Sequence, residues 1–185
     1  ITLAADASMV SLANTPTISG TLAVGTNTFS IDASGTAVDI TGAITGSGTL
    51  TKTGASRLEL DGDNSGFTGA MNLNEGSFRI GNSAGMSGGG TLVMADGTAI
   101  ESSSSANRTI TKDLTINGNV TFGAASTQTG TLIVDGSISL GSGTRTLTVA
   151  NGSGEYTEFQ GAISNGGLTK AGNGILYLTG DNTYA

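Results

Sequence analysis

Residues 42–64 read GAITGSGTLTKTGASRLELDGDN, and the stretch returns as GAISNGGLTKAGNGILYLTGDN at residues 161–182. One deleted residue brings the two copies into register, about 118 residues apart. The first copy continues through FTGAMNLNEGSFRIGN, so the repeat copies are predicted at about 42–80 and 161–185. The second copy stops before that continuation, which predicts a fragment of a longer repeat protein. Each copy holds several short apolar pieces, so the repeating unit should contain several strands.

Apolar residues alternate with Thr, Ser, Glu, Val or Tyr along the whole chain, whereas no long segment shows helical spacing. The alternating pieces are Leu58-x-Leu60, Phe78-x-Ile80, Leu92-x-Met94, Leu114-x-Ile116, Val120-x-Phe122, Leu132-x-Val134, Ile138-x-Leu140, Leu147-x-Val149 and Leu176-x-Leu178. Each piece predicts a strand of about 4 to 6 residues with one buried face. Gly, Asn, Asp and Ser fill the intervals because they accept turn conformations.

Three all-β architectures combine short strands with tight turns. A β-sandwich would not need the repeat, and a propeller would show blades of roughly 40–50 residues, which are absent. A β-solenoid stacks similar coils in an open-ended core and tolerates the irregular strand spacing. We therefore predict a single β-solenoid segment over residues 1–185. At about 4.8 Å per coil and roughly 20–25 residues per coil, it should be a rod roughly 40 Å long.

Composition excludes several classes of function. The net charge is −7 and the 7 cations are scattered, which disfavours nucleic acid and anionic membrane surfaces as partners. The absence of Cys and His excludes disulfides, thiol catalysis, Ser-His-Asp triads and Cys-based zinc sites. No apolar run approaches about 18 residues, so membrane insertion by this segment is not expected. ITLAADASMV at the start lacks the basic and apolar regions of a signal peptide.

The repeat resembles the autotransporter-associated β-strand repeat, also called the passenger-associated transport repeat. That pattern runs roughly G-x-I-x-G-x-G-x-L-x-K-x-G-x-G-x-L-x-L-x-G-x-N, followed by an aromatic residue, Thr and Gly. The first copy matches it at Gly42, Ile44, Gly46, Gly48, Leu50, Lys52, Gly54, Leu58, Leu60, Gly62, Asn64, Phe67, Thr68 and Gly69. The second copy matches at Gly161, Ile163, Leu168, Lys170, Gly172, Gly174, Leu176, Leu178, Gly180, Asn182 and Tyr184. Ala55 and Ser56 depart from the pattern before Arg57.

The resemblance implies a right-handed parallel β-helix, exported by a Gram-negative-type cell and displayed at its surface or released. A translocating β-barrel would lie elsewhere in the full chain. The expected role is a non-catalytic stalk or scaffold. Exposed β edges would allow end-to-end self-association into fibres. An adhesin that binds host or matrix glycans or proteins is the alternative, and a polysaccharide-degrading β-helix is a further one.

The stretch DGDNSG is the one candidate for a metal site. Asp61, Asp63 and Ser65 stand at alternate positions, as in the first half of an EF-hand loop. The acid required at position 12 of such a loop is Asn72, and the second copy lacks the first Asp and the closing Gly. The favoured interpretation is therefore a turn that joins two coils, with no cofactor and no metal.

Catalytic residues are not predicted. Glycosidases need two carboxylates at a set separation, but Glu155 and Glu158 are spaced to lie on opposite faces of a strand. Glu59 and Asp61 could share a face beside Arg57, which we interpret as solvated surface charge. The aromatic residues Tyr156, Phe159, Tyr177 and Tyr184 either form a small sugar-stacking surface or pack beside the core.

Overall fold

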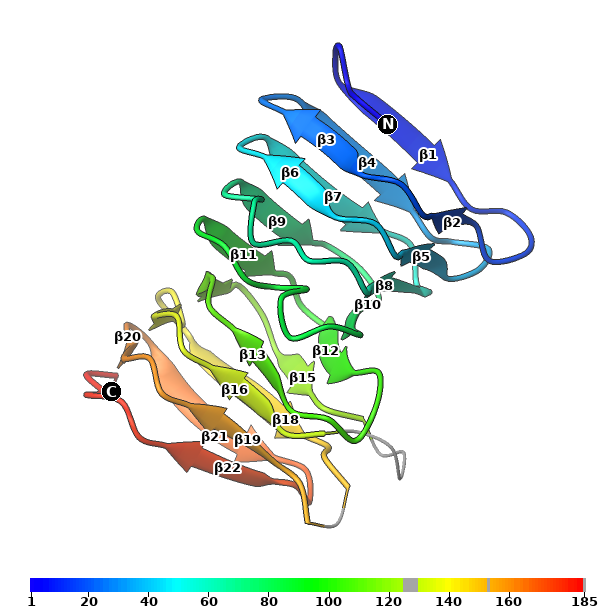
Figure 1. Ribbon diagram of the computed structural model, residues 1–185. Coiled ribbons are helices and arrows are strands. Elements are labelled where there is room, and N and C mark those ends of the chain that lie inside the picture. The colour runs from blue at the N-terminus through cyan, green and yellow to red at the C-terminus, as the bar shows by residue number, and fades with distance from the viewer. Residues whose placement is uncertain (125–129, 153, 185) are drawn as a thin grey trace.

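The computed structural model of the protein describes residues 1–124, 130–152 and 154–184, which form a stack of parallel β-coils (Figure 1). Every strand pairing in these ranges is parallel, and the described residues contain no helix. The all-β solenoid predicted from the alternating pattern is confirmed. A membrane-spanning helix is accordingly not found in the part of the chain that the structure describes.

Two long sheets run the length of the stack, and two shorter sheets lie beside them. The first sheet contains β1 (Ala7–Val10), β4 (Thr28–Asp32), β7 (Thr49–Thr53), β9 (Ala70–Leu73), β11 (Thr91–Met94), β14 (Asp113–Ile116), β17 (Ile138–Ser139) and β20 (Ile163–Ser164). The second sheet contains β2 (Thr17–Ile18), β5 (Val38–Ile40), β8 (Arg57–Leu60), β10 (Ser77–Ile80), β12 (Ala99–Ser102), β15 (Val120–Phe122), β18 (Thr144–Val149) and β21 (Gly167–Ala171). The two-stranded sheet contains β3 (Leu22–Gly25) and β6 (Ile44–Gly46), and the four-stranded sheet contains β13 (Arg108–Ile110), β16 (Leu132–Val134), β19 (Tyr156–Phe159) and β22 (Ile175–Leu178).

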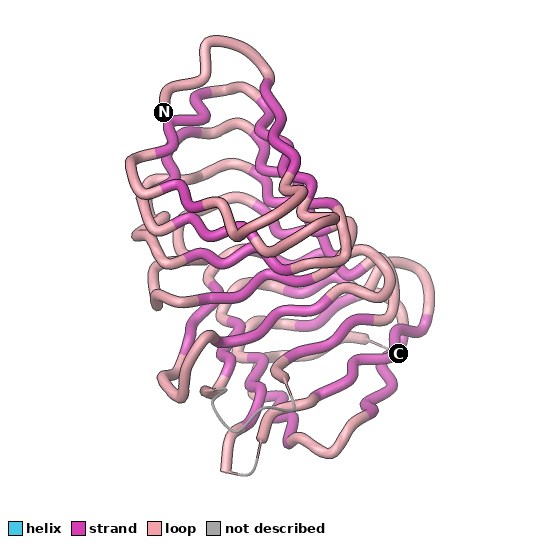
Figure 2. Tube along the Cα trace, turned by 90° about the vertical axis from the view of Figure 1, so that its right-hand side faces the viewer, coloured by secondary structure: helices cyan, strands magenta, loops and turns pink. Residues whose placement is uncertain are grey.

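The chain visits these sheets in a fixed order. A strand of the two-stranded or four-stranded sheet is followed by one of the first sheet and then by one of the second, as in β6, β7, β8 and again in β19, β20, β21. We call the side of the stack that carries the two shorter sheets, whose strands are labelled in Figure 1, the third side. Figure 2 shows the same stack of coils turned by 90°. Since the two long sheets have eight strands each, the solenoid makes about eight turns, which at about 4.8 Å per turn agrees with the expected rod.

The core is a set of columns that run along the axis. In the first sheet, register stacks one inward residue from each coil on the next, and all of them are buried: Phe29, Leu50, Met71, Leu92, Leu114, Ile138 and Ile163. In the second sheet the corresponding column is Val38, Leu58, Phe78, Ile100, Phe122 and Val149. Each coil therefore buries its apolar face only because its neighbours cover it, as expected for a solenoid.

The strands are shorter than the sequence suggests. Every alternating pair quoted above lies in or beside a strand, but the strands span only two to six residues. β17 ends at Ser139, so Leu140 is buried just after the strand. Turns and bends at the corners of the coil take up the remaining residues of each piece.

The recurring glycine that opens each repeat marks a close backbone contact. A Cβ at Gly42 would lie 2.2 Å from the Gly20 carbonyl oxygen, and one at Gly161 would lie 1.9 Å from that of Gly136. Such distances are shorter than any stable contact, so the coils stack at these corners only with glycine.

The two repeat copies occupy different sides of the solenoid. The first copy places its strands on the third side, the first sheet and the second sheet, as β6, β7 and β8. The second copy places the matching strands on the first sheet, the second sheet and the third side, as β20, β21 and β22. The interval between copies is therefore not a whole number of turns.

Candidate functional site

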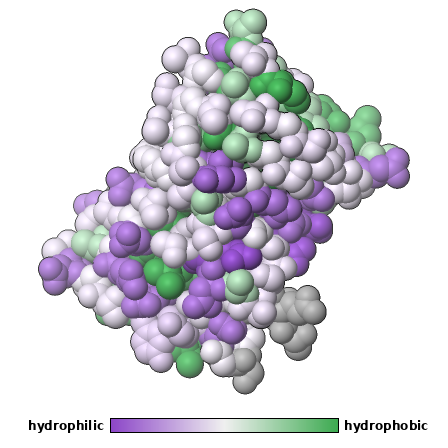
Figure 3. Space-filling model, in the orientation of Figure 1, coloured by the Kyte–Doolittle hydropathy of each residue, from purple (hydrophilic) through white to green (hydrophobic). Residues whose placement is uncertain are grey.

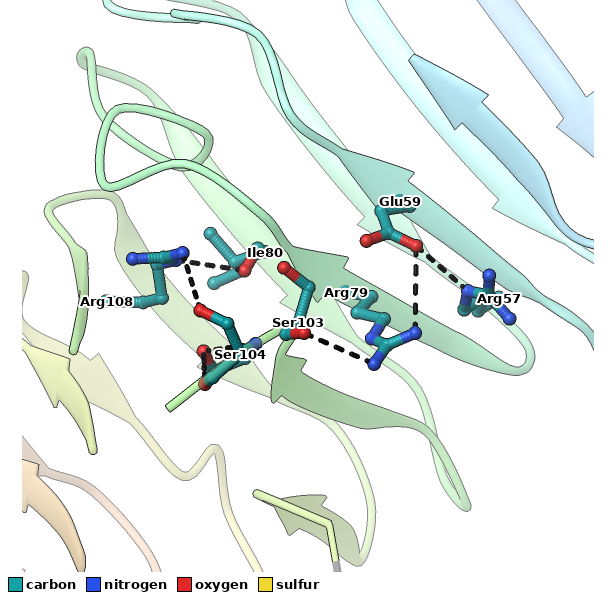
Figure 4. A network of polar contacts seen from close by, with 8 residues as sticks. Arg57, Glu59, Arg79, Ile80, Ser103, Ser104 and Arg108 are labelled. Carbon is teal, nitrogen blue, oxygen red and sulfur yellow. Dashed lines mark hydrogen bonds and ion pairs between the residues drawn. The ribbon is translucent and has the colours of Figure 1, made fainter. Parts of the chain in front are cut away.

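A ladder of charged residues crosses the outer face of the second sheet. Parallel register places Asp39, Glu59, Arg79 and Glu101 side by side on β5, β8, β10 and β12. The Arg57 Nε donates to Glu59 Oε2 at 3.1 Å, and Arg79 Nη1 lies 3.8 Å from the same oxygen (Figure 4). Arg57 and Glu59 lie close together, as the sequence predicts. The contact between Glu59 and Arg79 joins neighbouring coils and follows from the strand register.

The carboxylates of this ladder are electrostatically crowded. Burial, and then the adjacent Glu59, raises the pKa of Asp39, and burial is also the main cause of the raised pKa of Glu101. The Asp39 Oδ1 and Arg79 Nε atoms are buried without a hydrogen-bond partner among the described residues. Since Glu59 accepts from one arginine and faces another, its carboxylate serves as their counter-ion and is poorly placed to transfer a proton to a substrate.

The DGDNSG stretch forms the turn between β8 and the next coil. Asp63 is fully exposed, and its Oδ1 accepts a 3.0 Å hydrogen bond from the Ser65 amide. The Ser65 hydroxyl and, to a smaller extent, this amide bond lower the pKa of Asp63, whereas burial raises the pKa of Asp61. Among the described residues, no group of three acidic or other ligating side chains is placed to hold a metal ion.

Within this turn, the side chain of Asn64 bonds to backbone groups of the neighbouring coils. Its side chain is buried, with Oδ1 accepting from the Ile44 amide at 2.7 Å and Nδ2 donating to the Gly85 carbonyl at 2.9 Å. In the second copy, Asn182 Oδ1 accepts from the Ile163 amide at 2.9 Å. The signal was present in the sequence, because Asn recurs in both copies whereas Asp61 and Ser65 do not.

Two lysines point into the interior. The Lys52 Nζ donates to the carbonyls of Thr53, Gly54 and Glu75, at 2.9, 2.6 and 3.1 Å. The Lys112 Nζ donates to the Phe67, Gly69 and Gly89 carbonyls and lies 5.1 Å from the centre of the Phe67 ring. Burial lowers the pKa of each lysine to about 8.

The inward position of Lys52 is readable from its strand. It follows Leu50 by two residues, so both side chains lie on the same face of β7, and the column above and below Lys52 holds Ile31 and Leu73. In the second copy, the Lys170 Nζ donates to Ala171 and Gly172, the positions that match Thr53 and Gly54, but its side chain is exposed.

The four aromatic residues proposed as a sugar-stacking surface divide into two groups. Phe159 is buried and contacts the Phe122 ring edge-on, and Tyr184 packs partly buried against the core. Tyr156 and Tyr177 lie on the outer face of the third side, with ring centres 5.0 Å apart and planes at 82°. Of this pair, Tyr177 is exposed and Tyr156 is half-buried.

A recess adjoins the tyrosine pair. It has a volume of about 400 Å³ and is lined by Asn151, Gly152, Gly154, Glu155, Asn173, Gly174 and Ile175. The carboxylates of Glu155 and Glu158 each have a separate hydrogen-bond partner. Glu155 Oε2 accepts from the Thr131 hydroxyl at 2.7 Å, and Glu158 Oε1 accepts from the Thr179 hydroxyl at 3.2 Å.

Fold and repeat together define a parallel β-solenoid with an internal repeat, and comparison with known proteins shows what this repeat is similar to. Residues 50–80 and 168–185 match the family described as passenger-associated-transport-repeat, which confirms the resemblance seen in the sequence. The chain is 29% identical over 165 residues to the Adhesin BmaC autotransporter of Brucella suis biovar 1 (strain 1330). That alignment covers 86% of this chain and spans only about 4% of the length of the curated relative. No solved structure matches the chain.

Proposed function

We propose that this chain is a non-catalytic scaffold segment of an exported passenger region, displayed at or released from the surface of a Gram-negative cell. The observation that carries the proposal is the stacking of about eight turns, in which residues 50–80 and 168–185 match the passenger-associated transport repeat. A solenoid adds length with each coil, so it holds other regions away from the cell.

The side chains support a role without catalysis. The carboxylates on the second sheet face arginines or one another, and Glu155, just before β19, and Glu158, in β19, each accept from a threonine. Both buried amines are enclosed by backbone carbonyls. The outer surface therefore offers a substrate few acidic or basic side chains that lack a hydrogen-bond or ion-pair partner.

Adhesion is the second candidate. It is favoured by the outward-facing pair of Tyr156, which is half-buried, and Tyr177, which is exposed, and by the name of the autotransporter to which the chain is similar. A scaffold and an adhesive surface are compatible in one segment, because the core residues build the coil while the outward residues are free to vary.

Two measurements test the scaffold role. Antibodies raised against this chain should label intact cells of the source bacterium, and labelling confined to permeabilised cells would overturn the proposal. In addition, removal of residues 22–43 deletes one whole turn, since Leu22 pairs with Ile44 in register. The shortened protein should still fold and reach the surface, whereas removal of residues 22–32, half a turn, should abolish both.

A further inference from the structure

We propose that Asp39 and Glu59 form an acid-sensitive contact between two neighbouring coils, in which one proton taken up from solution is held between the two carboxyl groups. The proton binds the Asp39 carboxylate, and the resulting O–H group donates a hydrogen bond to Glu59. The contact therefore strengthens as the surroundings become more acidic. It concerns the middle coils of the stack, and it applies to a scaffold and to an adhesin alike.

The two carboxyl groups are neighbours on the outer face of the second sheet. Register places Asp39 of β5 directly beside Glu59 of β8, and neighbouring strands lie about 4.8 Å apart. Both strands lie inside the sheet, because β5 has β2 on its other side and β8 has β10. Two ionised carboxylates that share a site repel each other, so a single shared proton relieves the repulsion.

The Asp39 carboxyl group has an oxygen that lacks a donor. Its Oδ1 is buried and accepts no hydrogen bond from the described residues. Leaving a buried acceptor unpaired costs free energy, whereas a protonated carboxyl group is itself a donor. On the other side of Asp39, the in-register neighbour is Thr17 of β2, which carries no charge. Protonation would thus turn the unpaired Asp39 carboxyl group into a donor toward Glu59.

Glu59 is well placed to accept that hydrogen bond. Its side chain is only 14% exposed, and its Oε2 accepts from Arg57 Nε at 3.1 Å and lies 3.8 Å from Arg79 Nη1 (Figure 4). Both arginines approach Oε2, so Oε1 is the oxygen left to accept from Asp39. A hydrogen bond from a carboxyl O–H to a carboxylate is charge-assisted and roughly twice as strong as a neutral one.

The charges around Asp39 give the direction of the pH response. Burial is the largest cause of its raised pKa and the Glu59 charge is the second, whereas Arg57 and Arg79 lower it. Because the pKa lies above the ordinary value of 3.8, the folded protein holds more protons than the unfolded chain just above that pH. The stability that the contact contributes is therefore fully present below pH 3.8 and is lost as the pH rises through the raised pKa.

Two further carboxyl groups belong to the same cluster. Burial is the main cause of the raised pKa of Asp61 and of Glu101, and Glu59 raises both further. Arg79 opposes the shift of both, together with Arg108 for Asp61 and Arg57 for Glu101. Glu101 stands in register beside Arg79, and Asp61 lies just after the end of β8. Asp39 is thus the one of the three whose in-register neighbour is a carboxylate.

Solvent protons can reach the contact without opening the coils. In the space-filling view, strongly hydrophilic residues gather at mid-height, over the part of the stack where Figure 1 places β8, β10 and β12 (Figure 3). Asp39 itself is half-buried. The proton therefore exchanges with the surroundings while the strand pairing stays intact.

The first test is Asp39→Asn, because an asparagine amide has the shape of a protonated carboxyl group and donates from Nδ2. At pH 7 the melting temperature should rise by about 2–4 °C. At pH 4, where the unmodified chain carries the proton, the gain should shrink to less than about 1 °C. Asp135→Asn removes the same charge from an exposed position between β16 and β17. It is the matched control and should shift the melting temperature by less than about 1 °C at both pH values.

The second test follows the proton directly in the unmodified chain. Carbon-13 NMR of the aspartate carboxyl groups should show Asp39 titrating above pH 3.8, its ordinary pKa. Glu59→Gln removes the adjacent negative charge and leaves both arginines without their carboxylate, so the titration of Asp39 should move to lower pH.

Three results would each overturn the inference: titration of Asp39 at or below pH 3.8 in the unmodified chain, an Asp39→Asn variant that is no more stable than the unmodified chain at pH 7, or an Asp39 titration that Glu59→Gln leaves unchanged. If a variant does not fold, the titration of the unmodified chain decides the question. Each of these results would leave the scaffold proposal standing, since cell-surface labelling tests that separately.

Discussion

The side chain of Asn64 accepts a 2.7 Å hydrogen bond from the backbone amide of Ile44, which lies one turn earlier in the solenoid. The bond replaces a backbone ladder contact at a corner where no strand continues, and Asn182 and Ile163 repeat it. The polar asparagine at the end of Gly-Asp-Asn is thus a structural element of the coil.

Replacing Asn64 by Ala should destabilise the protein by about 1–3 kcal/mol, because the buried Ile44 amide loses its acceptor. Urea denaturation followed by circular dichroism measures the change. Asp63→Asn, at the exposed neighbour, keeps the turn-forming side chain and should change stability by less than about 0.5 kcal/mol. Equal effects of the two substitutions would show that the Asn64 bond contributes nothing specific.

Gly42→Ala should be severely destabilising, since its Cβ would lie 2.2 Å from the Gly20 carbonyl oxygen. The coils must separate locally to admit the methyl group, at a cost of about 1–3 kcal/mol or more. Gly20→Ala is the matched control, because a Cβ there meets nothing within 4 Å. The control should be neutral or stabilising by up to about 1 kcal/mol. A thermal melt that ranks the two variants the other way would refute the close-contact explanation.

Stability should depend on pH through Lys52 and Lys112, whose pKa values are both lowered by burial to about 8. The unfolded chain keeps the ordinary lysine pKa, so it binds more protons than the folded protein between about pH 8 and pH 10.5, and the free energy of unfolding rises with pH over that range. The rise should be roughly 1–3 kcal/mol per lysine.

Urea midpoints measured from pH 7.5 to pH 10 check this expectation. Lys52→Met together with Lys112→Met should flatten the rise relative to the unmodified chain. Lys170→Met removes an exposed amine from the equivalent repeat position and serves as the control. An unchanged slope in the double variant would mean that the buried amines do not govern the pH response.

Calcium should not bind at the DGDNSG turn with appreciable affinity. Asp63 is exposed and its Oδ1 already accepts from the Ser65 amide, and a lone exposed carboxylate makes a poor calcium site. Calorimetric titration with Ca²⁺ should give no saturable heat. A saturable signal that disappears in Asp63→Ala would reverse the interpretation of this stretch.

The strands and the solenoid could be predicted because period-2 alternation and an internal repeat are local signals. The Leu50-x-Lys52 alternation also predicts that Lys52 points inward, although a charged side chain is usually expected at the surface. Partnerships between coils could not be predicted. The Arg79 side chain meets Glu59 only because β8 and β10 stack in register. That register depends on how many residues each corner takes up, which the pattern of apolar residues leaves open.

End-to-end association of the rod stays a prediction, which sedimentation at high concentration can test.

The offset between the two repeat copies has a consequence for how the rod meets its surroundings. Matching strands move on by one of three sides from the first copy to the second. Side chains at equivalent repeat positions therefore lie on different sides of the solenoid. If the same interval continued, three successive copies would present one repeat position all the way round the circumference. A ligand or neighbouring cell would then meet that position whatever the rotation of the rod.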